Sequence, residues 1–232
     1  MSELATAIFQ GGPAPEEGKG DIAYGTAGFR ARAETLTCVM YRVGCLASLR
    51  SFTQNNQSIG VVVTASHNPE QDNGVKIVDP SGGMLEASWE GHATRMANAR
   101  SPSDVDAVLA AIFHSRSQGL PSVAELSASQ VVVGMDTRKS SPEHSSLVKA
   151  GVAACGAKCL DLGLSTTPQV HWAVMQLNKS LPHTHEDYHE HFAKAYLDLL
   201  GADRYAQLPP LTVDCANGVG ALSMQGLKKA LG

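Results

Sequence analysis

One short segment combines three side chains that could handle a phosphate group. Residues 64–69 place the hydroxyl of Ser66 beside the imidazole of His67 and the amide of Asn68. They follow residues 59–63, an apolar and β-branched run typical of a strand buried on both faces. Because open α/β sheets form binding crevices where strands end, this spacing predicts a phosphate site at Ser66. No G-x-S-x-G sequence is present, which argues against a hydrolase nucleophile elbow.

A histidine-rich stretch points to a second kind of chemistry, metal binding. His183, His185, His189 and His191 are interleaved with acidic residues. Two histidines four residues apart on a helix can bind zinc. No second cluster in the sequence completes such a site, so we interpret the stretch as the solvated polar face of a helix.

The elements that must position these residues alternate between helix and strand. Apolar residues recur at intervals of three and four from Leu36 to Phe52, which predicts an amphipathic helix. A strand is expected at residues 75–78. Helices are expected near residues 86–99 and 103–115, the second with Ser103 as its N-cap.

Residues 130–162 read as strand, helix, strand, with the helix beginning at Ser141 and Pro142. This βαβ pattern favours parallel strands joined by a right-handed crossover. Another helix is expected from Pro168 to Leu177. We therefore predict an α/β fold in which a mixed, largely parallel sheet is sandwiched by helices.

We divide the chain into three parts. Residues 1–23, rich in Gly, Pro, Ala and Glu, are expected to be a loosely ordered lead-in. Residues 24–178 are expected to form one α/β domain. Residues 179–232, with helices at 186–200 and 218–231 and a strand at 211–214, are expected to be the truncated start of a second, similar domain.

Composition narrows the classes of partner. The chain has 232 residues, 43% of them hydrophobic, which is enough to bury one full core. Its net charge of −4, without a basic run, excludes nucleic acid or an anionic membrane as the main partner. No apolar stretch approaches the roughly 20 residues of a membrane span, and no secretory signal is readable. Five cysteines without CxxC spacing indicate reduced thiols, so we expect a cytoplasmic protein.

Five segments in one order resemble the α-D-phosphohexomutase superfamily. They are YGTAGFR at 24–30, TASHNP at 64–69, DNGVK at 72–76, GMDTR at 134–138 and VDCANGVGA at 213–221. The short spacing between Arg30 and Ser66, together with residues 78–90, is similar to the phosphoacetylglucosamine mutase branch of that superfamily.

The resemblance implies a role for each matching residue. Ser66 would be a phosphoserine that converts N-acetylglucosamine 6-phosphate into N-acetylglucosamine 1-phosphate through a bound 1,6-bisphosphate, a step toward UDP-N-acetylglucosamine. His67 and Lys76 would be proton-transfer candidates, and Arg30 would complete the catalytic set. One Mg²⁺ would bind partly through the phosphate on Ser66. The residues expected to bind substrate or phosphate are Tyr24, Thr64, Asn68, Asp136 and Arg138.

The sequence also departs from the superfamily pattern. Its D-G-D-A-D-R metal loop has no counterpart, because Leu199 and Leu200 stand where carboxylates are expected, and Met135 and Lys139 replace a common arginine and proline. We expect the isolated chain to have little or no mutase activity. Two alternatives follow: a non-catalytic module that binds hexose phosphates or regulates, and a phosphoglucomutase or phosphomannomutase. No oligomeric state is predicted.

Overall fold

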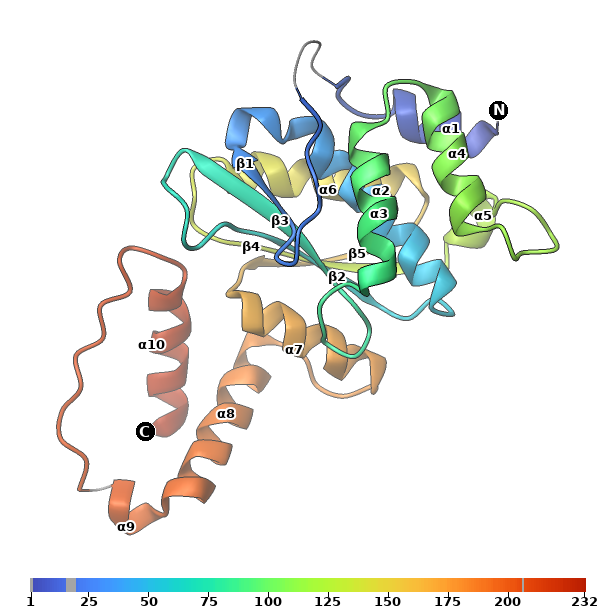
Figure 1. The fold of residues 1–232 in the computed structure, drawn as a ribbon. Coiled ribbons are helices and arrows are strands. Elements are labelled where there is room, and N and C mark those ends of the chain that lie inside the picture. The colour runs from blue at the N-terminus through green and yellow to red at the C-terminus, as the bar shows by residue number, and fades with distance from the viewer. Residues whose placement is uncertain (1, 16–19, 206) are drawn as a thin grey trace.

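A five-stranded mixed sheet forms the centre of the molecule (Figure 1). The computed structural model describes residues 2–15, 20–205 and 207–232. The strands are β1 (Phe29–Arg32), β2 (Ile59–Val63), β3 (Asp72–Val78), β4 (Gln130–Met135) and β5 (Lys158–Leu164), in the spatial order β1-β3-β2-β4-β5. β3 is antiparallel to β1 and to β2, whereas β4 is parallel to β2 and to β5. The predicted mixed sheet is confirmed, and its parallel half contains the predicted βαβ unit.

Helices cover both faces of the sheet. On one face lie α2 (Thr37–Thr53) and α6 (Ser141–Ala154), with α3 (Ala87–Asn98), α4 (Pro102–Ile112) and the short α5 (Val123–Leu126) in the outer layer (Figure 1). On the other face α7 (Thr167–Asn178) packs Val170 and Val174 against Val62, Val78 and Val132. This double cover explains why residues 59–63 are all buried and show no alternation.

The helix α2 differs from the prediction. Periodicity indicates an amphipathic helix, yet residues 38–51 are buried on every side, including Arg42, Ser48 and Arg50. The reason is tertiary: α6 packs so closely that a Cβ added at Gly44 would lie 2.0 Å from the carbonyl oxygen of Val148. A helix enclosed by a sheet and further helices has no solvated face.

The N-terminal lead-in is more ordered than predicted. A helix, α1 (Glu3–Gln10), begins at the N-cap Ser2 and buries Leu4, Ala5 and Ile8 against a cluster that includes residues of α4. The expectation of a loose segment is therefore wrong for residues 3–10, because packing stabilises a helix too short to be stable alone. Residues 16–19 of this lead-in lie outside the described residues.

Helix α4 also begins earlier than predicted. Ser101, not Ser103, is its N-cap, and the Ser101 side chain accepts a hydrogen bond from the amide of Asp104 at 3.2 Å. Pro102 then occupies the first helical position, where its missing N–H is tolerated.

The C-terminal part consists of α8 (His185–Leu200), α9 (Ala202–Tyr205) and α10 (Gly220–Leu231). α8 and α10 pack together, and an extended connection leads from α9 to α10 (Figure 1). The strand predicted at residues 211–214 is wrong: Leu211 is 83% exposed, and no neighbouring strand pairs with this segment among the described residues. A separate second domain stays a prediction. Within the described ranges no helix is long and apolar enough to cross a membrane.

Candidate active site

The Ser66 loop opens into a cleft at the carboxyl edge of the parallel half of the sheet. β2, β4 and β5 run in one direction and end at Val63, Met135 and Leu164, so the loops that follow them meet at one edge. The connection at residues 215–220 lines the same cleft, which encloses about 820 Å³. Ser66 lies exposed within it. The structure thus places Ser66 where the sequence predicts.

A chain of hydrogen bonds runs inward from the Ser66 hydroxyl. Thr64 Oγ1 donates to Asp136 Oδ2 at 2.7 Å and lies 3.3 Å from Ser66 Oγ. A hydroxyl carries a single proton, and Thr64 gives its proton to the carboxylate. Ser66 is therefore the donor in the Thr64–Ser66 contact, so the direction of its O–H bond is set by two residues behind it.

Asp136 is the buried centre of this arrangement. Its second oxygen, Oδ1, accepts from Ser141 Oγ at 2.6 Å and from the backbone amide of Arg138 at 3.0 Å. Asp136 therefore lines the cleft only from beneath and acts on Ser66 through Thr64. Sequence reasoning missed Ser141; the only signal for it was its place at the start of a helix.

Arg138 lines the cleft, but its guanidinium is engaged by the protein itself. Its guanidinium bonds to backbone carbonyls of the Ser66 loop, and its Nε lies 3.4 Å from Asp136 Oδ2. The expected phosphate-binding role is therefore not what the contacts of this side chain indicate.

Two cations lie on the α7 face of the sheet beside the strand that leads to Ser66. Arg30 on β1 pairs with Gly74 on β3, and Gly74 in turn accepts from the amide of Thr64 at 2.9 Å. These three residues form one row across the sheet, which places Arg30 and Thr64 about 10 Å apart in the direction perpendicular to the strands. No side chain fits at Gly74, since a Cβ there would lie 2.6 Å from the carbonyl oxygen of Phe29 and 3.2 Å from Arg30 Cγ. An arginine side chain can span such a row toward Ser66.

Lys76 lies one pair further along β3, opposite Val62. Burial, and then the positive charge of Arg30, lower the pKa of Lys76. Among the described residues neither cation has a hydrogen bond or a carboxylate partner. Two unpaired cations side by side repel each other in the absence of an anion, which favours phosphate binding.

Among the described residues, a hydrogen bond holds the side chain of Asn68 but not that of His67. His67 is exposed and makes no hydrogen bond within the described ranges, so its ring can exchange protons with a ligand. Asn68 Nδ2 donates to Asp72 Oδ2 at 3.1 Å, which holds the far side of the loop.

Tyr24 lies away from the cleft, contrary to its expected substrate-binding role. Its side chain is 5% exposed, and its ring packs edge-on against Phe29 in the core. Its hydroxyl accepts a hydrogen bond from the amide of Ile77 at 2.9 Å, on the stretch of β3 beyond the last pair with β1. Burial raises its pKa to about 12. Tyr24 therefore completes the sheet edge.

The histidine-rich stretch does not form a metal site. No group of three or more metal-ligating side chains occurs among the described residues. His185 Nε2 lies 2.9 Å from Ser165 Oγ, and His189 Nε2 lies 3.3 Å from both Gln169 and Ser223. These histidines instead link α8 to neighbouring elements, a role that the sequence did not indicate.

The absence of a group of three or more metal-ligating side chains among the described residues also bears on magnesium. The carboxylate nearest Ser66 in the hydrogen-bond chain, that of Asp136, is occupied by Thr64, Ser141 and Arg138. Mg²⁺ requires six oxygen ligands in near-octahedral geometry. The residues described here therefore do not fit a complete Mg²⁺ site.

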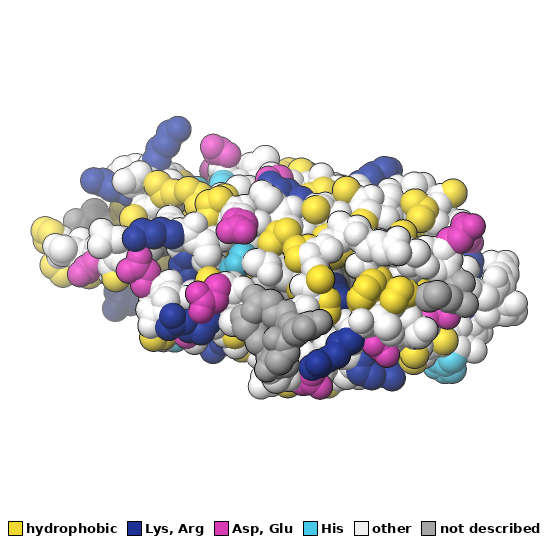
Figure 2. Space-filling view, turned by 90° about the horizontal axis from the view of Figure 1, so that it is seen from above, with side chains coloured by type: hydrophobic (Ala, Val, Ile, Leu, Met, Phe, Trp, Pro, Cys, Tyr) yellow, Lys and Arg dark blue, Asp and Glu magenta, His cyan; other side chains and the backbone are white. Residues whose placement is uncertain are grey.

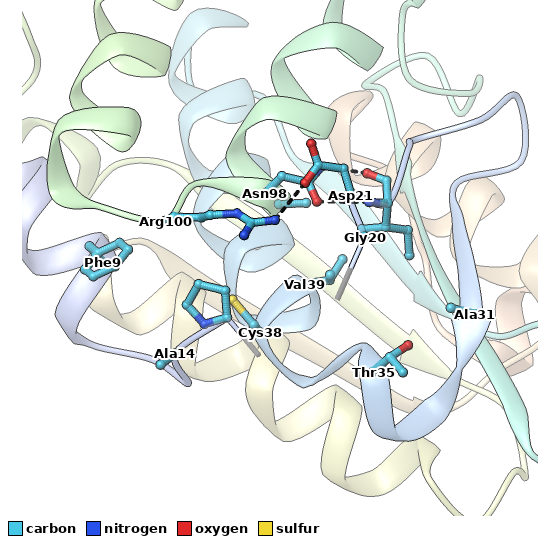
Figure 3. A pocket seen from close by; sticks show the side chains of 13 residues that line it. Phe9, Ala14, Gly20, Asp21, Ala31, Thr35, Cys38, Val39, Asn98 and Arg100 are labelled. Carbon is cyan, nitrogen blue, oxygen red and sulfur yellow. Dashed lines mark hydrogen bonds and ion pairs between the residues drawn. The ribbon is translucent and has the colours of Figure 1, made fainter. Parts of the chain in front are cut away.

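A second pocket, of about 800 Å³, lies on the α2 face near the N-terminal segment (Figure 3). Arg100 and Asp21 form an ion pair there at 3.2 Å, and the Asn98 side chain accepts from the amide of Ile22 at 2.9 Å. These polar groups bind one another, so the Ser66 cleft with its unpaired cations nearby is the better candidate for a phosphate ligand.

Comparison with known proteins agrees with this geometry. Residues 41–104 and 105–182 match the family described as phosphoglucomutase/phosphomannomutase, alpha/beta/alpha domain I. The chain is 46% identical over 215 residues to phosphoacetylglucosamine mutase of Homo sapiens, a match that covers 89% of this chain and 38% of the human protein. The chain thus spans well under half the length of the curated relatives it matches.

Solved structures show the same likeness. Aspergillus fumigatus N-acetylphosphoglucosamine mutase in complex with glucose 1,6-bisphosphate has 38% identity and a TM-score of 0.85, over 100% of this chain and 43% of that one. The enzyme from the same organism in complex with N-acetylglucosamine 6-phosphate and magnesium has 36% identity and a TM-score of 0.81, over 100% of this chain and 42% of that one. This chain therefore belongs to the phosphoglucomutase/phosphomannomutase family, and the resemblance of its sequence to phosphoacetylglucosamine mutases is confirmed.

Proposed function

We propose that this chain provides the phosphoserine part of a phosphoacetylglucosamine mutase, with Ser66 as the residue that carries the phosphoryl group. The observation that carries the proposal is the exposed Ser66 hydroxyl in a cleft at the sheet edge, oriented by Thr64, with Arg30 and Lys76 on the same face of the sheet as Thr64. The substrate class comes from the relatives, one of which binds N-acetylglucosamine 6-phosphate.

The proposed reaction has two balanced halves. In the first, the Oγ–P bond of phosphorylated Ser66 breaks, phosphorus bonds to O1 of the sugar phosphate, and the O1 proton passes to Oγ. In the second, the P–O6 bond of the 1,6-bisphosphate breaks, Oγ regains a phosphoryl group, and its proton passes to O6. The net product is N-acetylglucosamine 1-phosphate.

The chain's own residues support this chemistry in distinct ways. Charge spreads over the transferred oxygens in phosphoryl transfer, and Arg30 and Lys76 can offset it. Burial and the charge of Arg30 lower the pKa of Lys76, a direction that favours the role of proton carrier proposed for this residue. His67, exposed in the loop, is the second proton carrier in the proposal.

The proposed Mg²⁺ cofactor rests on the magnesium bound by the Aspergillus fumigatus relative. In this chain a phosphate on Ser66 would supply one ligand, and the residues described here offer no carboxylate set for the others. That same observation favours the second candidate function, a module that binds hexose phosphates without turning them over. Little or no mutase activity of the isolated chain stays a prediction.

The test is covalent labelling of Ser66. The purified chain is incubated with glucose 1,6-bisphosphate and Mg²⁺, and its intact mass is followed over time. We expect the wild-type chain and a Ser81→Ala control, which changes an exposed serine outside the cleft, to gain one phosphoryl group, and Ser66→Ala to gain none. Wild-type chain that stays unlabelled favours the binding module, and labelling that persists in Ser66→Ala contradicts the proposed carrier.

Two further measurements separate the alternatives. A coupled assay for N-acetylglucosamine 1-phosphate tests turnover, and sustained turnover would overturn the expectation of an inactive chain. Binding of the 6-phosphates of N-acetylglucosamine, glucose and mannose, followed by NMR, tests the sugar preference. Phosphoglucomutase or phosphomannomutase would be favoured if the N-acetyl group weakened binding.

We also propose a cytoplasmic location and no nucleic-acid or membrane partner. All five cysteines are free, and three of them are buried, as suits a reducing compartment. On the face seen in Figure 2, acidic and basic side chains are interspersed over the coloured surface, without a continuous basic patch. Nucleic-acid binding would require such a patch.

A further inference from the structure

The guanidinium of Arg138 donates several hydrogen bonds to backbone carbonyls of the Ser66 loop. A guanidinium has five N–H groups in a planar fork. In Arg138, Nη1 donates to the carbonyl oxygens of Pro69 at 2.7 Å and Asp72 at 2.9 Å, while Nη2 donates to those of Asn68 at 2.9 Å and of Ala65. Nη1 also lies 3.4 Å from the carbonyl oxygen of Glu70, and Nε lies 3.4 Å from Asp136 Oδ2 in an ion pair. The loop therefore engages the N–H groups on both Nη1 and Nη2.

The acceptors lie on both sides of Ser66. Ala65 precedes it directly, and Asn68, Pro69 and Asp72 follow it, so the loop wraps around one half-buried cation. The Arg138 side chain is 13% exposed, whereas that of the adjacent Lys139 is 92% exposed and pairs only with Glu70 at 3.2 Å. Arg138 therefore faces inward into the loop, whereas the neighbouring Lys139 faces solvent.

This inward bonding has a consequence for the outer side of the loop. Its carbonyls turn toward Arg138, while the backbone amides of Ser66 and His67 have no acceptor among the described residues. Successive free N–H groups form anion-binding concavities in other proteins. The two amides, beside the Ser66 hydroxyl, are therefore available to the oxygens of a phosphoryl group.

We propose that Arg138 is a positioning residue: it organises the Ser66 loop from inside by holding its carbonyls and so presents the Ser66 and His67 amides to the phosphoryl group. The inference rests on the proposed function, and it reassigns Arg138 from phosphate ligand to loop organiser. A phosphate ligand would need charge; a loop organiser needs the forked geometry of five donors, which lysine cannot reproduce.

The test compares Arg138→Lys with Lys139→Gln and Arg30→Lys in the full chain. The amides of Asn68 and Asp72 are the protected ones in this loop, because they donate to the carbonyl oxygens of Ala65 and Pro69. Their hydrogen exchange is expected to rise about tenfold or more in Arg138→Lys, because at least two charge-assisted bonds are lost. It should stay unchanged in both controls. The rate of phosphoryl transfer from glucose 1,6-bisphosphate to Ser66 should also fall by about tenfold or more in Arg138→Lys. Binding of N-acetylglucosamine 6-phosphate should change by less than about threefold.

The opposite pattern would overturn the inference. If Arg138→Lys keeps normal exchange at Asn68 and Asp72, or loses sugar-phosphate affinity while it keeps the transfer rate, Arg138 is a ligand. Exchange in β4 reports whether the variant is folded. If the Arg138→Lys variant unfolds, NMR of the Arg138 guanidinium in the wild-type chain provides the test. Its N–H protons should exchange slowly, and their resonances should not shift when inorganic phosphate is added. A shift contradicts the proposal. Failure of wild-type Ser66 to become labelled is a separate result that counts against the proposed function.

Discussion

The hydrogen bond from Thr64 to Asp136 offers a sharp test of the site's construction. Thr64 is 5% exposed and donates at 2.7 Å to a buried carboxylate. The substitution Thr64→Val preserves the shape of the side chain and removes only the hydroxyl. It leaves Asp136 Oδ2 with a single partner, the Nε of Arg138 at 3.4 Å, and leaves the Ser66 hydroxyl without its acceptor.

The expected loss of stability in Thr64→Val follows from the burial and the charge of the Asp136 carboxylate. A hydrogen bond to a charged group contributes about 1.5–3 kcal/mol, and a buried acceptor that loses its donor also loses hydration. We therefore expect Thr64→Val to lower the free energy of unfolding by about 2 kcal/mol, equivalent to about 4–8 °C in Tm for a chain of this size. Thr137→Val is the matched control, because Thr137 is exposed and its bond to the Asn217 carbonyl is 3.3 Å long. Its expected loss is below about 0.5 kcal/mol.

Urea unfolding of the full chain, followed by circular dichroism, measures both variants. A double-mutant cycle with Asp136→Asn isolates the pair, and a coupling energy above about 0.5 kcal/mol is expected for residues in contact. If Thr64→Val is no less stable than Thr137→Val, the hydroxyl of Thr64 is not engaged by the carboxylate. The assigned donor direction of Ser66 would then fall with it.

Three further predictions concern the scaffold. Gly44→Ala should lower the free energy of unfolding by about 2 kcal/mol, since a Cβ 2.0 Å from a backbone carbonyl oxygen outweighs the roughly 1 kcal/mol gained in helix propensity. Gly91→Ala is the control: the space around Gly91 is open, so this substitution should raise the free energy of unfolding by about 0.5–1 kcal/mol. The urea midpoints of the two variants compare them. Burial lowers the pKa of His144, so the unfolded chain binds more protons and stability should fall as the pH drops below about 6.5; His144→Gln should flatten the urea midpoint against pH. Asp79→Ala should cost about 3 kcal/mol in thermal unfolding, because it strips the buried Arg50 of its two-point partner at 2.7 and 2.9 Å; a loss below about 1 kcal/mol contradicts this.

Local patterns in the sequence identified most elements that carry the site. The unbroken β-branched run at residues 59–63 predicts a strand buried on both faces, and it is one. Ser141 and Pro142 mark the start of α6, as proline fits the first turn of a helix. Such signals depend on a few neighbouring residues, and each is complete within its own segment.

Local patterns misled where packing or pairing came from distant segments. Residues 3–10 form a helix because α4, about a hundred residues away in the chain, covers its apolar side. Residues 211–214 have strand composition but no neighbouring strand within the described ranges, and a strand is stable only when its backbone groups are paired.

The sequence alone determined which residue could carry a phosphoryl group: Ser66, at the end of a buried strand, within a motif that resembles the superfamily. Tertiary structure decided what the residues around it do. Tyr24 completes a sheet edge, Asp136 acts through Thr64, and Arg138 holds the loop from inside. A side chain's type states which bonds it can make, but its partners lie up to about 70 positions away in the chain, and only the fold brings them within bonding distance.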